Sequence, residues 1–167
     1  VITAIRELLK LGYNIPSKSV YNGFSYVAEF TGLMGRWQVL QDMKPKIVCD
    51  TGHNIDGMKY IVEQLKAEKC KTLHIVLGMV NDKDISSILS LLPRKAIYYF
   101  TRASIPRAMD ERLLQEMAGK KGLTGYSYPT VAEAVAAARE WALPDDFVFI
   151  GGSNFVVGEA LQAFGIV

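Results

Sequence analysis

From Gly35 onward, short apolar runs alternate with longer stretches in which apolar residues recur every three or four positions. Short apolar runs are typical of strands that are buried on both faces of a parallel sheet, and the wider spacing is typical of amphipathic helices. The predicted strands are 36–40, 46–50, 72–77, 96–100 and 147–150, with a shorter one near 124–127. The predicted helices are 55–66, 85–92, 110–118, 130–141 and 154–164.

This alternation predicts a three-layer α/β domain with a mostly parallel sheet and helices on both faces. The strand at 36–40 comes before the first strand–helix unit, so we expect it at an edge of the sheet, where it can run antiparallel. Thr130 and Glu133 have the spacing of a capping box, which makes the helix at 130–141 the best-marked helix of the chain.

Residues 1–34 differ in pattern from the rest of the chain. Residues 1–11 have helical spacing, Gly12 and Pro16 stop that helix, and a weaker helical stretch runs from Ser17 to Thr31. The pattern predicts a helix pair that leads into a linker. Because the chain opens on Val1 inside an amphipathic pattern and without an initiator Met, we expect a domain excised from a longer protein.

Composition narrows the class of protein further. Of the 167 residues, 50% are hydrophobic and 22% are charged, which is typical of one folded domain and excludes a disordered chain. A net charge of +2 predicts no nucleic-acid partner, and the absence of a long apolar run predicts no membrane span. We therefore expect a cytoplasmic protein, with Cys49 and Cys70 as reduced thiols.

The turn after the strand at 46–50 holds the first candidate for chemistry. Asp50, His53 and Asn54 come at the start of a helix, whose unpaired N–H groups favour a phosphate or ribose ligand. The turn alone leaves a second interpretation open, in which Asp50 and Asn54 only cap the helix and His53 is a surface residue.

Three further turns carry polar residues at strand ends. In the turn after the strand at 72–77, Asp84 is a predicted N-cap, and Lys83 could reach a phosphate or lie in solvent. In the turn after the strand at 96–100, Arg102 and Arg107 could clamp a carboxylate or be ordinary surface residues. Gly152 and Ser153 begin the last helix, where the backbone can approach a ligand. His74 lies within an apolar strand and is predicted to be a core residue. The chain contains neither a GxGxxG nor a GxxxxGK[ST] motif, so it cannot cradle a triphosphate alone.

Taken in order, five segments resemble the carboxyl-terminal domain of folylpolyglutamate synthase and its bifunctional relative dihydrofolate synthase, members of the Mur ligase superfamily. The resemblance covers nearly the whole chain and implies a Rossmann-like fold. The segments are Gly35-Arg36-Trp37-Gln38, Asp50-Thr51-Gly52-His53-Asn54, Gly78 to Asp84, Pro106-Arg107-Ala108 and Gly152-Ser153. Thr51 and Gly52 stand where the family has Gly and Ala, so the route of that turn needs to be checked.

The resemblance implies a role for each of these segments. Residues 1–34 resemble the last helices of the family's central ATPase domain and the interdomain linker, and 35–167 form the carboxyl-terminal domain. Among the nucleotide-binding residues Arg36, Asp50, His53 and Asn54, it places Asp50 near the ribose of ATP, and Arg36 and His53 near its phosphates. It implies that Arg107 and Ser153 help to place L-glutamate.

The resemblance also implies the reaction. The family uses ATP and Mg²⁺, held mainly by the upstream P-loop domain, to join L-glutamate to folate through an acyl phosphate. Cationic groups and helix termini are what a second domain would contribute to such chemistry. No catalytic base and no metal ligand is assigned in this chain, which we expect to be inactive by itself. Two alternatives stay open, namely another Mur-type amide ligase, such as a peptidoglycan precursor or cyanophycin-type ligase, and a stand-alone binding module of the same fold.

Overall fold

The computed structural model describes residues 1–81 and 84–167, which divide into two compact units, Val1–Met34 and Gly35–Val167. The first unit contains α1 (Ile2–Lys10), α2 (Ser17–Ser25) and α3 (Val27–Thr31), and none of these helices has a buried residue. The pattern predicted one weak helical stretch after Ser17. The structure instead has two helices, because the backbone leaves the helical region at Tyr26 (φ −118°, ψ 29°).

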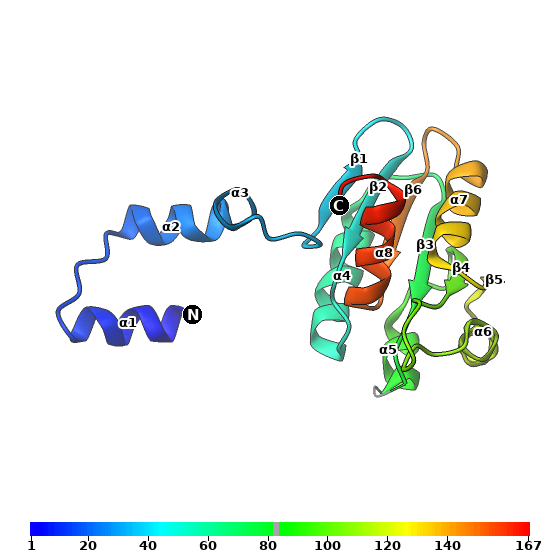
Figure 1. The fold of residues 1–167 in the computed structure, drawn as a ribbon, viewed down its shortest axis with the longest axis horizontal. Helices are drawn as coiled ribbons and strands as arrows, with labels where there is room; N and C mark the ends of the chain where they lie inside the picture. Colours follow the sequence, from blue (N-terminus) through cyan, green and yellow to red (C-terminus); the bar gives the residue numbers. More distant parts are fainter. Residues whose placement is uncertain (82–83) are drawn as a thin grey trace. The chain divides into compact units, whose positions relative to one another are not determined.

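The second unit is built on a six-stranded sheet with the strand order β1-β2-β6-β3-β4-β5 (Figure 1). β1 is antiparallel to β2, and every other neighbouring pair of strands is parallel. The mostly parallel sheet with an antiparallel edge strand is therefore confirmed. The strands are β1 (Gln38–Gln41), β2 (Lys46–Asp50), β3 (Leu73–Gly78), β4 (Ile97–Thr101), β5 (Thr124–Tyr128) and β6 (Phe147–Gly151).

Helices cover both faces of this sheet, as the alternating pattern predicted. One core holds apolar residues of α4, α5 and α6, and the other holds those of α7 and α8, each against side chains of the central strands. The residues with fully buried side chains include Tyr98, Tyr99, Phe100 and Phe149. The helices are α4 (Ile55–Ala67), α5 (Ile85–Leu91), α6 (Glu111–Gly119), α7 (Val131–Trp141) and α8 (Asn154–Ala163).

The first strand begins later than the pattern predicted, at Gln38 instead of Arg36. The reason is the backbone of Trp37, which has a φ of 41° and so cannot continue an extended strand. Arg36 therefore lies in a corner before β1.

The order of the strands creates a topological switch point at the carboxyl edge of the sheet. β6 lies between β2 and β3, and Asp50 at the end of β2 is in register with Gly151 at the end of β6. The chain leaves β2 for α4 on one face and leaves β6 for α8 on the other (Figure 1). Such a switch point is where open α/β sheets bind their ligands.

Candidate functional site

Three turns meet at this switch point. Gly152 in the turn after β6 has a φ of 94°, and a Cβ added there would lie 2.6 Å from the carbonyl oxygen of Gly78 at the end of β3. The turn after β6 thus rests directly on the end of its neighbouring strand, a close approach that requires glycine. The turn after β2 lies on the other side of β6.

Asp50 joins the turn after β2 to the corner before β1. Its Oδ2 accepts a hydrogen bond from the amide of Trp37, and its Oδ1 accepts one from the amide of Gly52, both at 2.7 Å. The amide of Thr51 donates to the carbonyl of Gly35 at 2.8 Å. These bonds hold the two segments together, and they use both oxygens of a carboxylate that is 7% exposed.

Trp37 fixes the corner from its other side. Its ring packs against Phe147 and Phe149 of β6, with centroid distances of 6.3 and 6.0 Å. The preceding residue, Arg36, is exposed. The corner therefore has a partly buried aromatic anchor, with an exposed cationic side chain directly before it.

His53 and Asn54 lie at the amino end of α4. The imidazole Nδ1 of His53 is 2.9 Å from the carbonyl oxygen of Thr51, and Asn54 caps the helix by accepting from the amide of Gly57 at 2.8 Å. Because a carbonyl oxygen can only accept, Nδ1 of His53 carries a proton. A neutral ring then presents Nε2 as an acceptor, and only the imidazolium can donate through Nε2.

The substitution of Gly52 for the family's Ala is explained by its surroundings. A Cβ at this position would contact Cδ1 of Ile61 in α4 and lie 3.1 Å from Oδ1 of Asp50. Ile61 fills the space that a side chain at position 52 would take. The turn keeps Asp50 and His53 at the carboxyl edge of the sheet.

Ser153 and Arg107 both contact Phe155 at the amino end of α8. Ser153 is 3% exposed and caps the helix by accepting from the amide of Phe155 at 3.2 Å. The guanidinium carbon of Arg107 lies 5.1 Å from the ring centroid of Phe155. Phe155 thus brings together two residues that the resemblance assigned to glutamate. Sequence reasoning missed Phe155, because nothing in the sequence separates its ring from core aromatics, and it named Trp37 only as part of a motif, with no role of its own.

Other candidate residues have structural partners. Arg102 lies 3.5 Å from Asp110 and 3.3 Å from Glu111, so it is held by two carboxylates. Asp84 is an N-cap as predicted, and its hydrogen bonds with the hydroxyl and amide of Ser87 lower the pKa of its carboxyl group. Lys83 lies outside the described residues.

His74 is a core residue, as predicted, with 1% of its surface exposed. Tyr99 Oη lies 2.9 Å from Nδ1 of His74, and Asp146 Oδ2 lies 3.3 Å from Nε2. Burial raises the pKa of Tyr99, which keeps its hydroxyl group as a donor to Nδ1. The proton of the His74 ring then lies on Nε2, which faces Asp146 Oδ2.

Both cysteines are free thiols. Burial, and next the charge of Asp50, raise the pKa of Cys49 to about 12. Burial likewise raises the pKa of Cys70. Neither environment favours the thiolate that a nucleophile or metal ligand requires. Among the described residues, no group of three or more His, Cys, Asp or Glu side chains could hold a metal ion.

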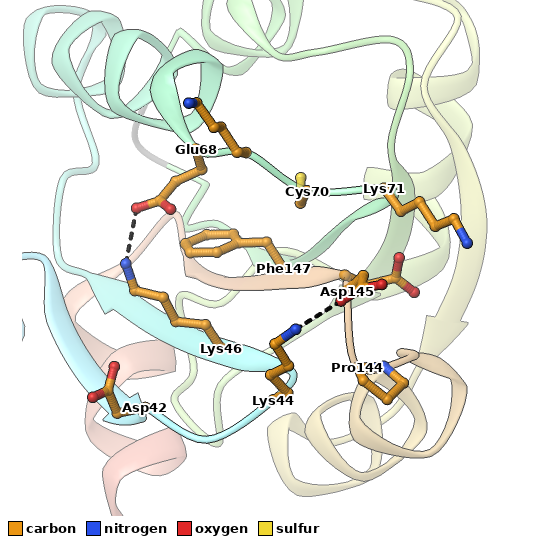
Figure 2. Close-up of a pocket in the computed structure, with 11 residues that line it drawn as sticks. Asp42, Lys44, Lys46, Glu68, Cys70, Lys71, Pro144, Asp145 and Phe147 are labelled. Atoms are coloured by element: carbon orange, nitrogen blue, oxygen red, sulfur yellow. Dashed lines mark hydrogen bonds and ion pairs between the residues drawn. The ribbon is translucent and has the colours of Figure 1, made fainter.

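A cavity of about 580 Å³ opens at the opposite, amino edge of the sheet (Figure 2). Lys44 pairs with Asp145 at 2.9 Å, and Lys46 pairs with Glu68 at 3.0 Å, so these four charges of the lining neutralise one another. Lys46 and Phe147 begin the strands whose other ends form the switch point. This amino-edge cavity is therefore separate from the candidate site.

The family of the chain follows from comparison with known proteins. Residues 35–154 match the family described as "Mur ligase, glutamate ligase domain". The chain belongs to the Mur ligase family. Within that family it resembles folylpolyglutamate synthase/dihydrofolate synthase, as the sequence motifs predicted.

Three similar proteins illustrate the resemblance. The chain is 34% identical over 129 residues to a probable bifunctional folylpolyglutamate synthase/dihydropteroate synthase of Haloferax volcanii, a match that covers 75% of this chain and 15% of that protein. Its fold matches E. coli FolC in complex with DHPP and ADP, with a TM-score of 0.81 and 26% identity over 98% of this chain and 38% of that one.

The third is a bifunctional folylpolyglutamate synthase/dihydrofolate synthase with Mn, AMPPNP and L-glutamate bound. Its TM-score is 0.71 and its identity 27%, over 80% of this chain and 32% of that one. The chain thus spans well under half the length of each of these three relatives. Separately, none of the helices in the described part of the chain is long and apolar enough to cross a membrane.

Proposed function

We propose that this chain is the carboxyl-terminal part of an ATP-dependent ligase that adds L-glutamate to folate through an acyl phosphate. The observation that carries the proposal is the switch point between β2 and β6. There the Arg36 corner, His53 and the amino ends of α4 and α8 occupy the carboxyl edge of the sheet. Relatives bind ADP, AMPPNP with Mn, and L-glutamate, which supports a nucleotide and an amino acid as ligands.

The nucleotide is assigned to the side of the site formed by β2. The exposed guanidinium of Arg36, the His53 ring and the positive end of α4 all favour an anion. Asn54 contributes by starting that helix, and Asp50 contributes through the two amides that its carboxylate holds. Mg²⁺ is assigned to the upstream P-loop domain.

L-Glutamate is assigned to the side formed by β6 and α8. Arg107 supplies a guanidinium that suits a carboxylate, and its stacking on Phe155 limits where that group can lie. Ser153 uses its oxygen as a helix cap and keeps its hydroxyl proton for a ligand. The two groups lie at the end of α8 that favours negative charge.

The chemistry needs positioning and charge stabilisation more than it needs a base from this domain. The carboxylate of folate takes the terminal phosphoryl group of ATP, the amine of glutamate attacks the acyl phosphate, and the tetrahedral adduct releases phosphate to give the amide. Arg36, His53 and the helix ends would stabilise negative charge during these steps. We assign no residue of this chain as the general base.

Residues 1–34 are proposed to be the end of the central ATPase domain and its linker. Their three helices leave large apolar side chains exposed, including Leu9, Tyr21 and Phe30, and none of these 34 residues, all of which the structure describes, is buried. Helices with uncovered apolar faces need a partner surface to be stable. An upstream domain of the same chain would supply it.

The experiment is a ligation assay with the full-length parent protein. Mg-ATP, L-glutamate and a reduced folate are combined, and both ADP and the folate product are measured. We expect ADP release that depends on both co-substrates and a folate lengthened by one glutamyl residue. Turnover with a peptidoglycan precursor or a cyanophycin primer instead of folate would assign the protein to another branch of the family. ATP binding without any ligation would favour a binding module.

A further inference from the structure

Residues 102–109, which join β4 to α6, include a tight turn that carries Arg107. The amide of Ala108 donates to the carbonyl of Ile105 at 3.0 Å, so the four residues from Ile105 to Ala108 form a β-turn, with Pro106 at its second position. Arg107 is the third residue of this turn. The direction of its side chain therefore depends on how the turn is attached to the rest of the domain.

One attachment of the turn is to the segment that follows β3. The amide of Asn81 donates to the carbonyl of Arg107 at 3.1 Å, and the amide of Met109 donates to the carbonyl of Met79 at 2.9 Å. These backbone bonds fix the carboxyl side of the turn. They leave its amino side to be held by other contacts.

The amino side of the turn is held by α8. The amide of Ser104 donates to Oε1 of Glu159 at 2.6 Å, across 55 residues of sequence. Phe155, whose ring packs against the guanidinium of Arg107, lies four residues before Glu159 and so on the same side of the helix. One side of α8 thus contacts the segment twice, at its backbone through Glu159 and at its cationic group through Phe155.

From this geometry we infer that Glu159 is a positioning residue for the glutamate substrate, because it holds the turn that presents Arg107. The inference rests on the proposed function and deepens it by naming a residue that acts on glutamate binding through another. Without the Glu159 carboxylate, Ser104 can leave α8 and the turn can pivot on its attachment to the segment after β3. Arg107 is then less often in the place where it meets a substrate carboxylate.

The first test is Glu159→Ala in the full-length protein. The KM for L-glutamate should rise about tenfold with kcat within about threefold of the wild type, because the contact of Arg107 is made in the bound substrate as well as in the transition state. The KM for Mg-ATP should stay within about twofold, since the nucleotide is assigned to the side formed by β2. An unchanged KM for glutamate, or an equal rise in both KM values, would overturn the inference.

Glu140→Ala is the matched control for this variant. Glu140 is an exposed glutamate on α7, a helix that carries none of the residues assigned to glutamate binding. Its replacement removes one carboxylate and should leave both KM values as they are in the wild type. A tenfold rise in the KM for glutamate in Glu140→Ala would show that the loss of any acidic charge is sufficient, and would overturn the inference.

The second test separates positioning from direct contact with the substrate. Glu159→Gln keeps an acceptor oxygen for the amide of Ser104, so its KM for glutamate should lie within about threefold of the wild type. A carboxylate that bound the amine of glutamate directly would be lost in Gln as in Ala, and equal defects in the two variants would overturn the inference. In an Arg107→Ala background, Glu159→Ala should raise this KM by less than about twofold, because the group through which it acts is gone. A full further tenfold rise there would contradict the inference.

A third measurement does not depend on turnover. Hydrogen exchange of the ligand-free full-length protein should be faster in Glu159→Ala than in the wild type for a peptide covering 102–108, and unchanged for one covering 147–151. Glu159→Gln should exchange as the wild type does. Unchanged exchange at 102–108 in Glu159→Ala would overturn the inference. If the wild-type protein ligates no glutamate to folate, the proposed function fails, while the exchange result still decides whether Glu159 holds the turn.

Discussion

At the scale of single residues, the hydrogen bond between His53 and Thr51 decides what the imidazole can do. Nδ1 donates to the carbonyl of Thr51, so contact with a phosphate oxygen requires a second proton on Nε2. In a neutral ring with this hydrogen bond, the single N–H group is already used.

His53→Ala in the full-length protein should lower kcat more than it raises the KM for ATP. Domain closure forms this contact late, and losing one preorganised donor costs on the order of 10²-fold. Steady-state kinetics of the variant and the wild type would measure the loss. A kcat within a factor of about two of the wild type, under roughly 0.5 kcal/mol, would make His53 a surface residue without a catalytic role.

Asp146→Asn tests the buried network around His74. Burial raises the pKa of Asp146, but hydrogen bonds from the Leu143 amide, His74 and Thr72 outweigh burial and leave that pKa below its usual value. Because the pKa of Asp146 is lower in the folded protein, its ionised form stabilises the fold at pH values above the pKa of the unfolded chain, about 4. This stabilisation is lost as the pH falls through the folded-state pKa.

Asp146→Asn should therefore lower the free energy of unfolding by about 2 kcal/mol at neutral pH, and by less at pH 3.5. Urea denaturation of the 167-residue chain at both pH values measures this difference. The adjacent Asp145, whose side chain is 62% exposed and pairs with Lys44, is the control. Asp145→Asn should cost much less than Asp146→Asn, because an exposed ion pair contributes little to stability. Equal losses of unfolding free energy in the two variants would show that the buried network around His74 stabilises the fold no more than an exposed ion pair does.

Several residue-level roles could be predicted from the sequence, and they share a local cause. The caps formed by Asn54, Asp84 and Thr130 depend on side chains three residues from their partners. The two bonds of Asp50 could not be predicted as a pair, because one of them spans 13 residues and depends on the conformation of Trp37.

At the scale of secondary-structure elements, α7 shows how small residues allow close packing. Ala134 and Ala138 are fully buried between α7 and the sheet, and Ala136 is exposed on the same helix. Ala138→Leu should lower the free energy of unfolding by about 1 to 3 kcal/mol through overpacking, and Ala136→Leu should change it by under about 0.5 kcal/mol. Thermal or urea unfolding of both variants checks this. Equally small changes in the unfolding free energy of both variants would mean that α7 does not pack closely on the sheet.

The elements themselves were largely predictable because the buried strands are short, apolar and separated by amphipathic helices. β2 has the predicted bounds, β5 and β6 each end one residue later than predicted, and β3 and β4 are each shifted by one residue at both ends. The start of β1 was wrong because nothing local marks Trp37 as left-handed. The insertion of β6 between β2 and β3 depends on long-range packing, which periodicity does not report.

At the scale of the whole molecule, the proposal makes this chain half of a nucleotide site. It lacks a phosphate loop, so Mg-ATP should bind it only in the millimolar range, roughly −4 kcal/mol. It should neither hydrolyse ATP nor ligate glutamate alone. Titration calorimetry and an ADP-release assay on the 167-residue chain would test this. A micromolar dissociation constant would contradict the proposal and favour a stand-alone binding module.

The central claim is that the nucleotide meets this domain at the carboxyl edge, between β2 and β6. Hydrogen exchange of the full-length protein, with and without Mg-AMPPNP, folate and L-glutamate, tests it most directly. The account predicts slower exchange in peptides covering 35–38 and 51–57 when the ligands are present, and no change at 68–71 and 144–147 around the amino-edge cavity. Unchanged exchange at the carboxyl edge, or protection confined to the amino-edge cavity, would contradict it.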